Sequence, residues 1–276
     1  MKLINLVENT PGAEGCQSAH GLSFYIETQH HRLLMDAGPG PVLVDNADAL
    51  GVDLSRVDTV VLSHGHYDHA DGLPAFARRN PHAAIYLHKG AEQPRFSLDP
   101  KGYRYNGMDP DIAALPNLVW TQGRVDLDEE LSLFDGASHE KLWPRSNRRL
   151  FCQREGQMVQ DPFDHEQYLV VREDWDTRVL LSGCAHQGIV NILNRFWEVY
   201  GGEPDAVVSG FHMMKRAGGY TREDLDLIRQ TAFWLREHYG GELYTCHCTG
   251  LEPFREMKAI LGQRLHYVHC GETLQL

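Results

Sequence analysis

Short apolar runs rich in branched side chains recur along the chain, separated by polar or glycine-containing turns. Runs of this length and composition predict buried strands. In the first half, the predicted strands lie at 2–7, 22–27, 32–36, 57–62, 84–87, 117–120, 124–127 and 131–134. In the second half, they lie at 168–171, 178–181, 205–209 and 243–245.

Amphipathic segments follow several of these strands. We expect helices near 42–50, at 73–79, from Ile189 through Phe196, from a cap at Thr221 to about His238, and around 254–260. Strands with helices following them in both halves indicate the α/β class. No glycine-rich dinucleotide fingerprint is present, which argues against a nucleotide-binding doubly wound sheet.

Two segments break the pattern. Residues 89–116 contain four prolines among glycine and tyrosine, and we expect an irregular lid or cap there. Residues 141–154 carry five basic residues and no acidic one, which either attracts an anionic substrate or forms a solvated loop face. No linker separates two domains, so we expect one domain over 1–276 with insertions near 89–116 and 138–165.

Composition narrows the possible partners. The 276 residues include 38 acidic and 26 basic side chains, giving a net charge of −12. This balance disfavours bulk attraction to nucleic acid or to an anionic membrane. The start of the chain lacks the apolar core of a signal peptide, and the six cysteines form no C-x-x-C pair. We therefore expect a cytoplasmic protein with reduced thiols and neither nucleic acid nor membrane as a partner.

The chemistry concentrates in Ser63–Gly72, between the predicted strand 57–62 and the helix 73–79. This turn contains His64, His66, Asp68 and His69 in the spacing H-x-H-x-D-H. Imidazole and carboxylate are common ligands of divalent transition metals, and the alternating spacing suits two adjacent ions. A histidine-rich solvated turn is the alternative, but it does not account for this spacing. The stretch predicts a metal site.

Further candidate residues also follow predicted strands. His186, His212 and His247 each lie in a turn at a strand end. Asp36 ends the strand 32–36 and either orients a ligand histidine or forms a turn. Three cysteines, at 184, 246 and 248, flank the late histidines as either soft ligands or buried filler. The alternation of side chains along a strand favours filler.

These motifs resemble the metallo-β-lactamase superfamily, whose signature is H-x-H-x-D-H. The resemblance is closer to the branch of dihydropterin-ribofuranosylaminobenzene-phosphate synthase-like metal-dependent hydrolases. It is carried by residues 19–24, 34–38, 62–69, 166–167, 182–191, 210–212 and 247–250. The resemblance implies an αβ/βα four-layer sandwich, with two facing sheets, helices outside and metals along the common edge of the sheets.

The resemblance also implies a ligand set for each of two divalent ions, zinc or alternatively manganese or iron. One set is His64, His66 and His186, and the other is Asp68, His69 and His247. The superfamily usually adds a bridging aspartate at the strand end that here reads 209–212, Ser-Gly-Phe-His, with no aspartate. Three interpretations stay open: a weakly held second ion, substitution by His212, or a single-ion site.

The expected function is a metal-dependent hydrolase acting on a small anionic substrate, a phosphate ester or phosphodiester, and the branch name suggests a pterin-related one. Metals activate a water, and Asp68 both ligates and accepts its proton. His212 or a basic residue stabilises the developing anion. Substrate contacts are expected from His20, Arg145, Arg148 and Arg149. The alternatives are a lactonase or thioesterase at the same site, and a non-catalytic metal-containing ligand-binding protein.

Overall fold

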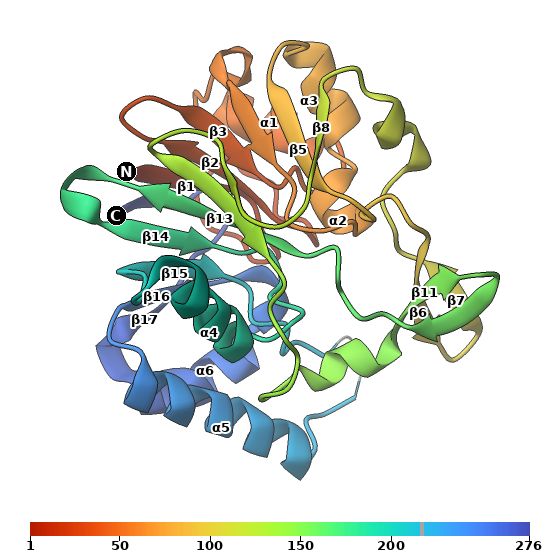
Figure 1. The fold of residues 1–276 in the computed structure, drawn as a ribbon, viewed down its shortest axis with the longest axis vertical. Helices are drawn as coiled ribbons and strands as arrows, with labels where there is room; N and C mark the ends of the chain where they lie inside the picture. The colour runs from red at the N-terminus through yellow and green to blue at the C-terminus, as the bar shows by residue number, and fades with distance from the viewer. Residues whose placement is uncertain (216–217) are drawn as a thin grey trace.

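Two large sheets face one another and carry most of the chain (Figure 1). In this computed structural model, residues 1–215 and 218–276 are described, and within them each of these sheets has seven strands. The first sheet has the order β18-β1-β2-β3-β4-β5-β8, with β1 (Lys2–Val7), β2 (Ser23–Glu27), β3 (Arg32–Met35), β4 (Thr59–Val61), β5 (Ala84–His88), β8 (Leu118–Thr121) and β18 (Thr273–Gln275). The second has the order β17-β16-β15-β14-β13-β10-β9, with β9 (Val125–Asp126), β10 (Leu131–Asp135), β13 (Gln167–Arg172), β14 (Arg178–Leu181), β15 (Ala206–Ser209), β16 (Glu242–Thr245) and β17 (Leu265–Tyr267).

Helices cover the outer face of each sheet (Figure 1). The first sheet is covered by α1 (Val42–Ala49) and α3 (Leu73–Arg79), and the second by α4 (Ile189–Tyr200), α5 (Arg222–His238) and α6 (Leu251–Leu261). A one-turn helix, α2 (Tyr67–Ala70), lies at the edge where the sheets meet. The layers are therefore helix, sheet, sheet and helix, which confirms the predicted αβ/βα sandwich.

Apolar packing between the layers explains this arrangement. Leu169 and Leu181 point into the core between the sheets, while Leu180 and Val207 point outward against Phe196 of α4. Neighbouring positions along a strand thus face opposite layers, so both faces of the central strands are apolar. Each fully buried side chain of this size contributes about 1.5–3 kcal/mol.

Parallel strands at the centre of both sheets position the site. In the first sheet β3, β4 and β5 run parallel, and in the second so do β14, β15 and β16. The carboxyl ends of parallel strands meet at one edge of a sheet. The turns after these strands, which carry the candidate ligands, therefore converge from both sheets.

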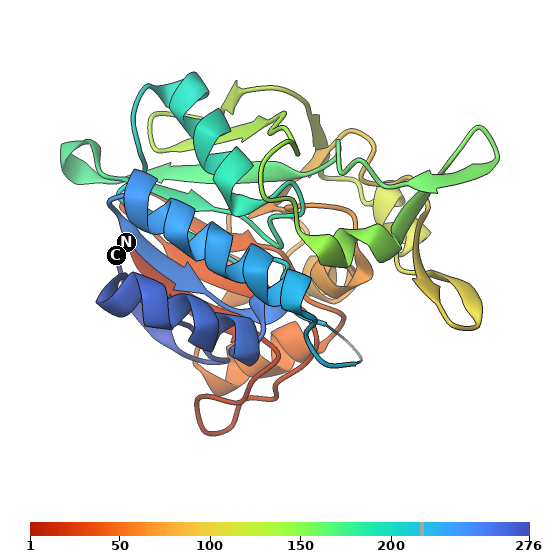
Figure 2. The same ribbon diagram turned by 90° about the horizontal axis from the view of Figure 1, so that it is seen from below.

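A smaller, four-stranded sheet stands at one end of the described molecule (Figure 2). It has the order β12-β11-β6-β7, with β6 (Arg95–Asp99), β7 (Gly102–Tyr105), β11 (Leu150–Arg154) and β12 (Gln157–Gln160). The expectation that 89–116 lacks regular structure is wrong, because β6 and β7 form a hairpin there. Strand β6 pairs with the distant β11, and every residue of β7 is exposed, so no local apolar alternation marks either strand.

The basic segment 141–154 is more ordered than the loop we expected. It contains a 3₁₀ helix, Arg145–Arg149, followed directly by β11. The predicted Thr221 cap is confirmed: its hydroxyl accepts a hydrogen bond from the Asp224 backbone N–H, and the Asp224 carboxylate accepts one in return. Among the described helices, none is long and apolar enough to cross a membrane.

Candidate metal centre

The first ligand set comprises His64, His66 and His186. His64 and His66 lie in the turn after β4, and His186 lies in the turn after β14 of the opposite sheet. His64 Nε2 lies 3.0 Å from His66 Nδ1 and 3.2 Å from His186 Nε2. All three side chains are buried, and their ligand atoms lie within 4.8 Å of one another.

The second ligand set comprises Asp68, His69 and His247. Asp68 and His69 lie on α2, and His247 begins the 3₁₀ helix His247–Thr249 after β16. His69 Nε2 lies 3.3 Å from His247 Nε2, and His247 Nε2 lies 3.7 Å from Asp68 Oδ2. These three residues are buried as well. The structure thus brings all six predicted ligands together in two adjacent sets.

The charge states suit metal binding. Burial lowers the pKa of His64, His186 and His247 well below the ordinary value, and burial lowers that of His66 to about 3. These rings are therefore neutral at physiological pH and offer lone pairs. Burial raises the pKa of Asp68, but His20 and His69 outweigh it and keep that pKa well below its usual range.

The spacing of the donor atoms also fits a bound ion. Two nitrogens bonded to one tetrahedral zinc at about 2.0–2.1 Å stand about 3.3 Å apart. The separations of 3.0, 3.2 and 3.3 Å between imidazole nitrogens are close to that value. The rings of His64, His66 and His186, whose pKa values are lowered by burial, gain little from packing this closely without an ion, because lone pair faces lone pair. The residues present therefore fit divalent metal ions.

Two asparagines hold the histidines that come from the second sheet. Asn147 Oδ1 accepts from His186 Nδ1, at 2.9 Å, and Asn147 Nδ2 donates to the His186 carbonyl, at 2.7 Å. Asn9 contacts His247 in the same way: its Oδ1 accepts from His247 Nδ1 at 2.8 Å, and its Nδ2 donates to the His247 carbonyl at 3.2 Å. Each amide fixes the ring so that Nε2 faces the ligand set. Sequence reasoning missed both, because neither asparagine is near its histidine in the chain.

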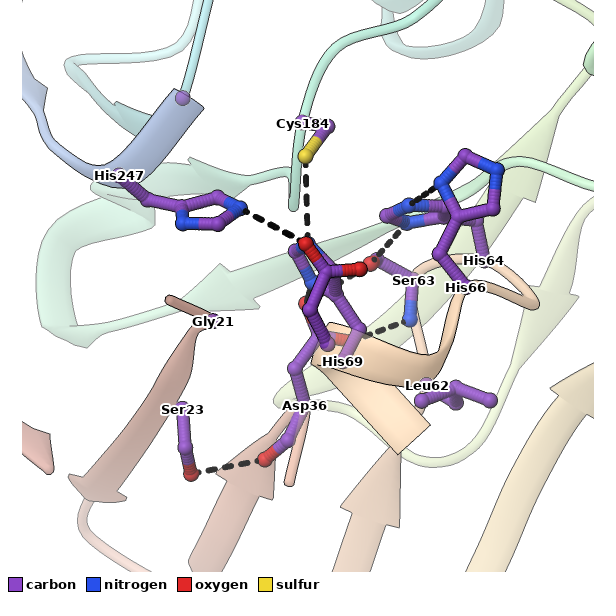
Figure 3. A network of polar contacts seen from close by, with 12 residues as sticks. Gly21, Ser23, Asp36, Leu62, Ser63, His64, His66, His69, Cys184 and His247 are labelled. Atoms are coloured by element: carbon purple, nitrogen blue, oxygen red, sulfur yellow. Dashed lines mark hydrogen bonds and ion pairs between the residues drawn. The ribbon is translucent and has the colours of Figure 1, made fainter. Parts of the chain in front are cut away.

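Asp36 organises the turn after β4. Its carboxylate accepts hydrogen bonds from the Ser63 backbone N–H and hydroxyl, and from His69 Nδ1 at 2.6 Å (Figure 3). Asp36 also has a positive φ of 64°. Both interpretations left open for Asp36 therefore apply, since it forms the turn and orients a ligand histidine. Gly183 is required opposite, because a Cβ there would overlap the Ser63 hydroxyl.

Two buried glutamates fix the turns that carry His186 and His247. Glu166 accepts from the backbone N–H groups of His186 and Gln187, at 2.6 and 3.0 Å. Glu8 accepts from the His247 N–H at 2.7 Å and from a tyrosine hydroxyl. These contacts hold the strand-end turns in place from below the ligand atoms.

Backbone strain gathers at the same place. Asp36, Ala185, His212 and His247 have φ values of 64°, 52°, 49° and 46°, in the left-handed region. Each such residue costs on the order of 1–3 kcal/mol unless its surroundings hold it. Four of the eight described non-glycine residues with a positive φ thus lie in the turns around the ligand sets, where buried hydrogen bonds hold them.

A cleft of about 290 Å³ opens beside the second ligand set. His20, Asp68, His212 and His247 line its floor, and His20 Nε2 lies 3.2 Å from Asp68 Oδ2. The His212 ring centroid stands 4.0 Å from that of His186. The structure therefore places both residues predicted as catalytic, and His20, at one opening.

The three predicted substrate arginines line the rim of this cleft but differ in their partners. Arg145 pairs with Glu223 and Asp224, and Arg149 donates to the Leu98 carbonyl and pairs with Asp99. Arg148 is exposed and has no carboxylate partner within the described part of the chain. Three of the five basic side chains of 141–154 are therefore paired with carboxylates. The partners of Arg145 and Arg149 lie far away in the sequence, so the sequence alone did not reveal these pairs.

The remaining histidines and cysteines near strand ends differ in how close they lie to the ligand sets. His165 is fully buried beside the ligands and accepts from the Gly65 N–H; it was missed because it follows no predicted strand. His88 pairs with Asp135 and lies outside both ligand sets. Cys246 packs in the core between the sheets, whereas Cys184 and Cys248 face the ligands. The filler expectation thus describes Cys246 alone.

Comparison with known proteins agrees with the fold and site. The model of the metallo-β-lactamase superfamily matches residues 19–145. An uncharacterized protein of Methanocaldococcus jannaschii is 26% identical, over 98% of both chains. From the same organism, 7,8-dihydropterin-6-methyl-4-(β-D-ribofuranosyl)-aminobenzene-5′-phosphate synthase is 24% identical, over 100% of this chain and 96% of its own. The solved structure of Tm1679, described as a metal-dependent hydrolase of the β-lactamase superfamily, superposes with a TM-score of 0.82 at 28% identity, covering 100% and 99% of the two chains.

The fold, the buried His/Asp cluster and these relatives together support a metal-dependent hydrolase. The chain is similar to the metallo-β-lactamase superfamily, by its motif region at residues 19–145 and by its fold over nearly the whole chain.

Proposed function

We propose that this chain binds two divalent metal ions, zinc or alternatively manganese or iron, and hydrolyses a small anionic substrate, a phosphate ester or phosphodiester. The observation that carries the proposal is the cleft, which has ligand residues on its floor and arginines on its rim. Two complete ligand sets stand side by side, which supports two ions rather than one. We also propose that the whole chain acts as one domain in the cytoplasm, without a nucleic acid or membrane partner.

The side chains have distinct roles in this proposal. When bound, the metals supply an activated water and polarise the bond under attack. Asp68 Oδ2 is placed to accept a proton, and His20 links that carboxylate to the open cleft. His212, which lines the same cleft beside His186, donates to the negative charge that develops on the substrate. No serine or cysteine nucleophile is required.

The anion preference rests on Arg148. Arg145 and Arg149 are engaged by carboxylates, so Arg148 is the rim arginine left to meet a phosphate, with the planar fork that suits one. The synthase from M. jannaschii is named for a product that carries a 5′-phosphate, which supports a phosphorylated ligand for this chain.

Metal content, with matched variants, is the first test. Elemental analysis of the purified protein should give close to two ions per chain, and His186→Ala and His247→Ala should each lose about one. The loaded protein should turn over members of a phosphodiester and phosphomonoester panel. Turnover confined to lactones or thioesters would replace the proposed reaction with acyl hydrolysis. Two bound ions without turnover on any panel would favour a ligand-binding protein.

Arg148→Ala tests the anion contact. Loss of hydrogen bonds to a charged group costs about 1.5–3 kcal/mol, so KM for an anionic substrate should rise about 10-fold or more with little change in kcat. Arg154→Ala is the control, because Arg154 pairs with Asp164 and is not among the residues that line the cleft. An equal effect of both substitutions would reject the role of Arg148.

A further inference from the structure

The strand end where the superfamily usually carries a bridging aspartate has a different construction here. Gly210 follows β15 directly, and a Cβ on Gly210 would overlap Cys248 Sγ and lie 3.1 Å from the Gly183 carbonyl oxygen. Cys248 Sγ also accepts from the His212 N–H, at 3.3 Å. The space into which an aspartate would grow is therefore filled by a sulfur and by backbone.

A second sulfur takes a position between the two ligand sets. Cys184 is 3% exposed, and its Sγ lies 3.2 Å from His69 Nε2. The same sulfur groups within 4.8 Å with His64 and His69, with His186 and His212, and with His247 and Cys248. Figure 3 shows Cys184 above His69, with His247 to one side and His64 and His66 to the other. Cys184, which belongs to neither ligand set, thus lies within ligand distance of histidines from both sets.

The chemistry of sulfur suits such a place. Thiolate binds zinc and similar ions at about 2.3 Å, and a sulfur and a nitrogen on one tetrahedral ion stand about 3.5 Å apart. The 3.2 Å between Cys184 Sγ and His69 Nε2 is close to this spacing. A thiolate keeps further lone pairs after binding one ion, so it can be shared by two.

We propose that Cys184 Sγ is a metal ligand shared by the two ligand sets, in place of the missing bridging aspartate. This inference rests on the two-metal centre proposed above. In this proposal the shared ligand comes from the turn after β14, whereas the superfamily uses the turn after β15. The second ion is then held without an aspartate and without substitution by His212, and the centre binds two ions.

Cobalt substitution tests the proposal without substrate. The metal is removed with a chelator, two equivalents of Co²⁺ are added, and the near-ultraviolet spectrum is read for thiolate-to-cobalt charge transfer. The full chain and Cys246→Ala should both show the band, because Cys246 lies in the core between the sheets. Cys184→Ala should lose it, and Cys248→Ala should keep it. A band that survives in Cys184→Ala and disappears in Cys248→Ala would overturn the proposal.

Sharing has its own readout. Two Co²⁺ ions joined by one sulfur couple magnetically, so the electron paramagnetic resonance signal of the loaded full chain should be attenuated. In Cys184→Ala, the second ion should bind at least about 100-fold more weakly, the upper end of the loss seen when a partner of a ligand is removed. Cys184→Asp should restore the second ion without the charge-transfer band. Uncoupled ions in a full chain that shows the band would reject sharing.

The two proposals fail separately. A full chain that binds no stoichiometric metal would overturn both. A full chain that binds two ions without a charge-transfer band would reject the role of Cys184 and leave the metal centre intact. Circular dichroism and Cys184→Ser guard against misfolding, since the hydroxyl preserves the size of the side chain and should still lack the band.

Discussion

Asn147 and Asn9 permit a test of the two ligand sets one at a time. Each amide accepts from the Nδ1 of one ligand histidine and donates to the backbone carbonyl of the same residue. Asn147 serves His186 in the first ligand set, and Asn9 serves His247 in the second. Asn147→Ala and Asn9→Ala should therefore weaken different ions while the direct ligands stay in place.

The magnitude follows from what each substitution removes. Losing the outer partner of a ligand histidine typically costs 10–100-fold in metal affinity, or about 1.4–2.8 kcal/mol. Asn147 is fully buried, so its removal also leaves the His186 ring N–H and carbonyl without their partners. We therefore expect Asn147→Ala near the upper end of this range and Asn9→Ala, whose second contact is longer, near the lower end.

Competitive titration against a chromophoric chelator measures each affinity. Asn80→Ala is the matched control, because Asn80 is buried and binds the carbonyls of Leu54 and Val57, in contact with neither ligand set. The control should lose stability but retain both affinities. If Asn147→Ala and Asn9→Ala weakened the same ion, or weakened neither beyond the control, the assignment of one asparagine to each ligand set would be wrong.

Three further outcomes test the supporting structure. Arg95→Leu should cost about 3–5 kcal/mol of unfolding free energy in a denaturant melt, because Asp161 loses its buried partner, and adding Asp161→Leu should recover part of it. Gly183→Ala should weaken both ions in the same titration, because its Cβ must displace the Ser63 hydroxyl, which contacts His64, and crowd Asp36, which holds His69; unchanged affinities would refute this. Burial raises the pKa of Asp224, but bonds from Lys215 and a threonine lower it to about 2, below the unfolded value near 3.9. This stabilisation is complete above about pH 4 and is lost as pH falls through 2, so Asp224→Asn should flatten stability in that window only.

The sequence by itself determined the fold class and the nature of the centre. Apolar strand runs and the amphipathic helices after them are local patterns, and the structure reproduces most of them. The spacing of His64, His66, Asp68 and His69 is also local, because these four residues share one turn between a strand and a helix. Such signals survive in a linear chain, since neighbours in sequence remain neighbours in space.

Tertiary structure decided which distant groups meet those residues. Strand β6 was missed because it pairs with β11, about fifty residues away, rather than with its neighbours alone. Arg145 forms ion pairs with Glu223 and Asp224, which belong to another helix. These partners are set by the packing of the layers, which no local pattern records.

The same reason applies to the direction in which a strand-end side chain points. Alternation along β16 places Cys246 in the core between the sheets, as the sequence indicates. Cys184 follows β14 in a turn where Ala185 has a positive φ, so alternation no longer governs and its sulfur faces the ligands. Backbone conformation in a turn depends on the contacts that hold it, here the buried Glu166, and only the folded chain supplies them.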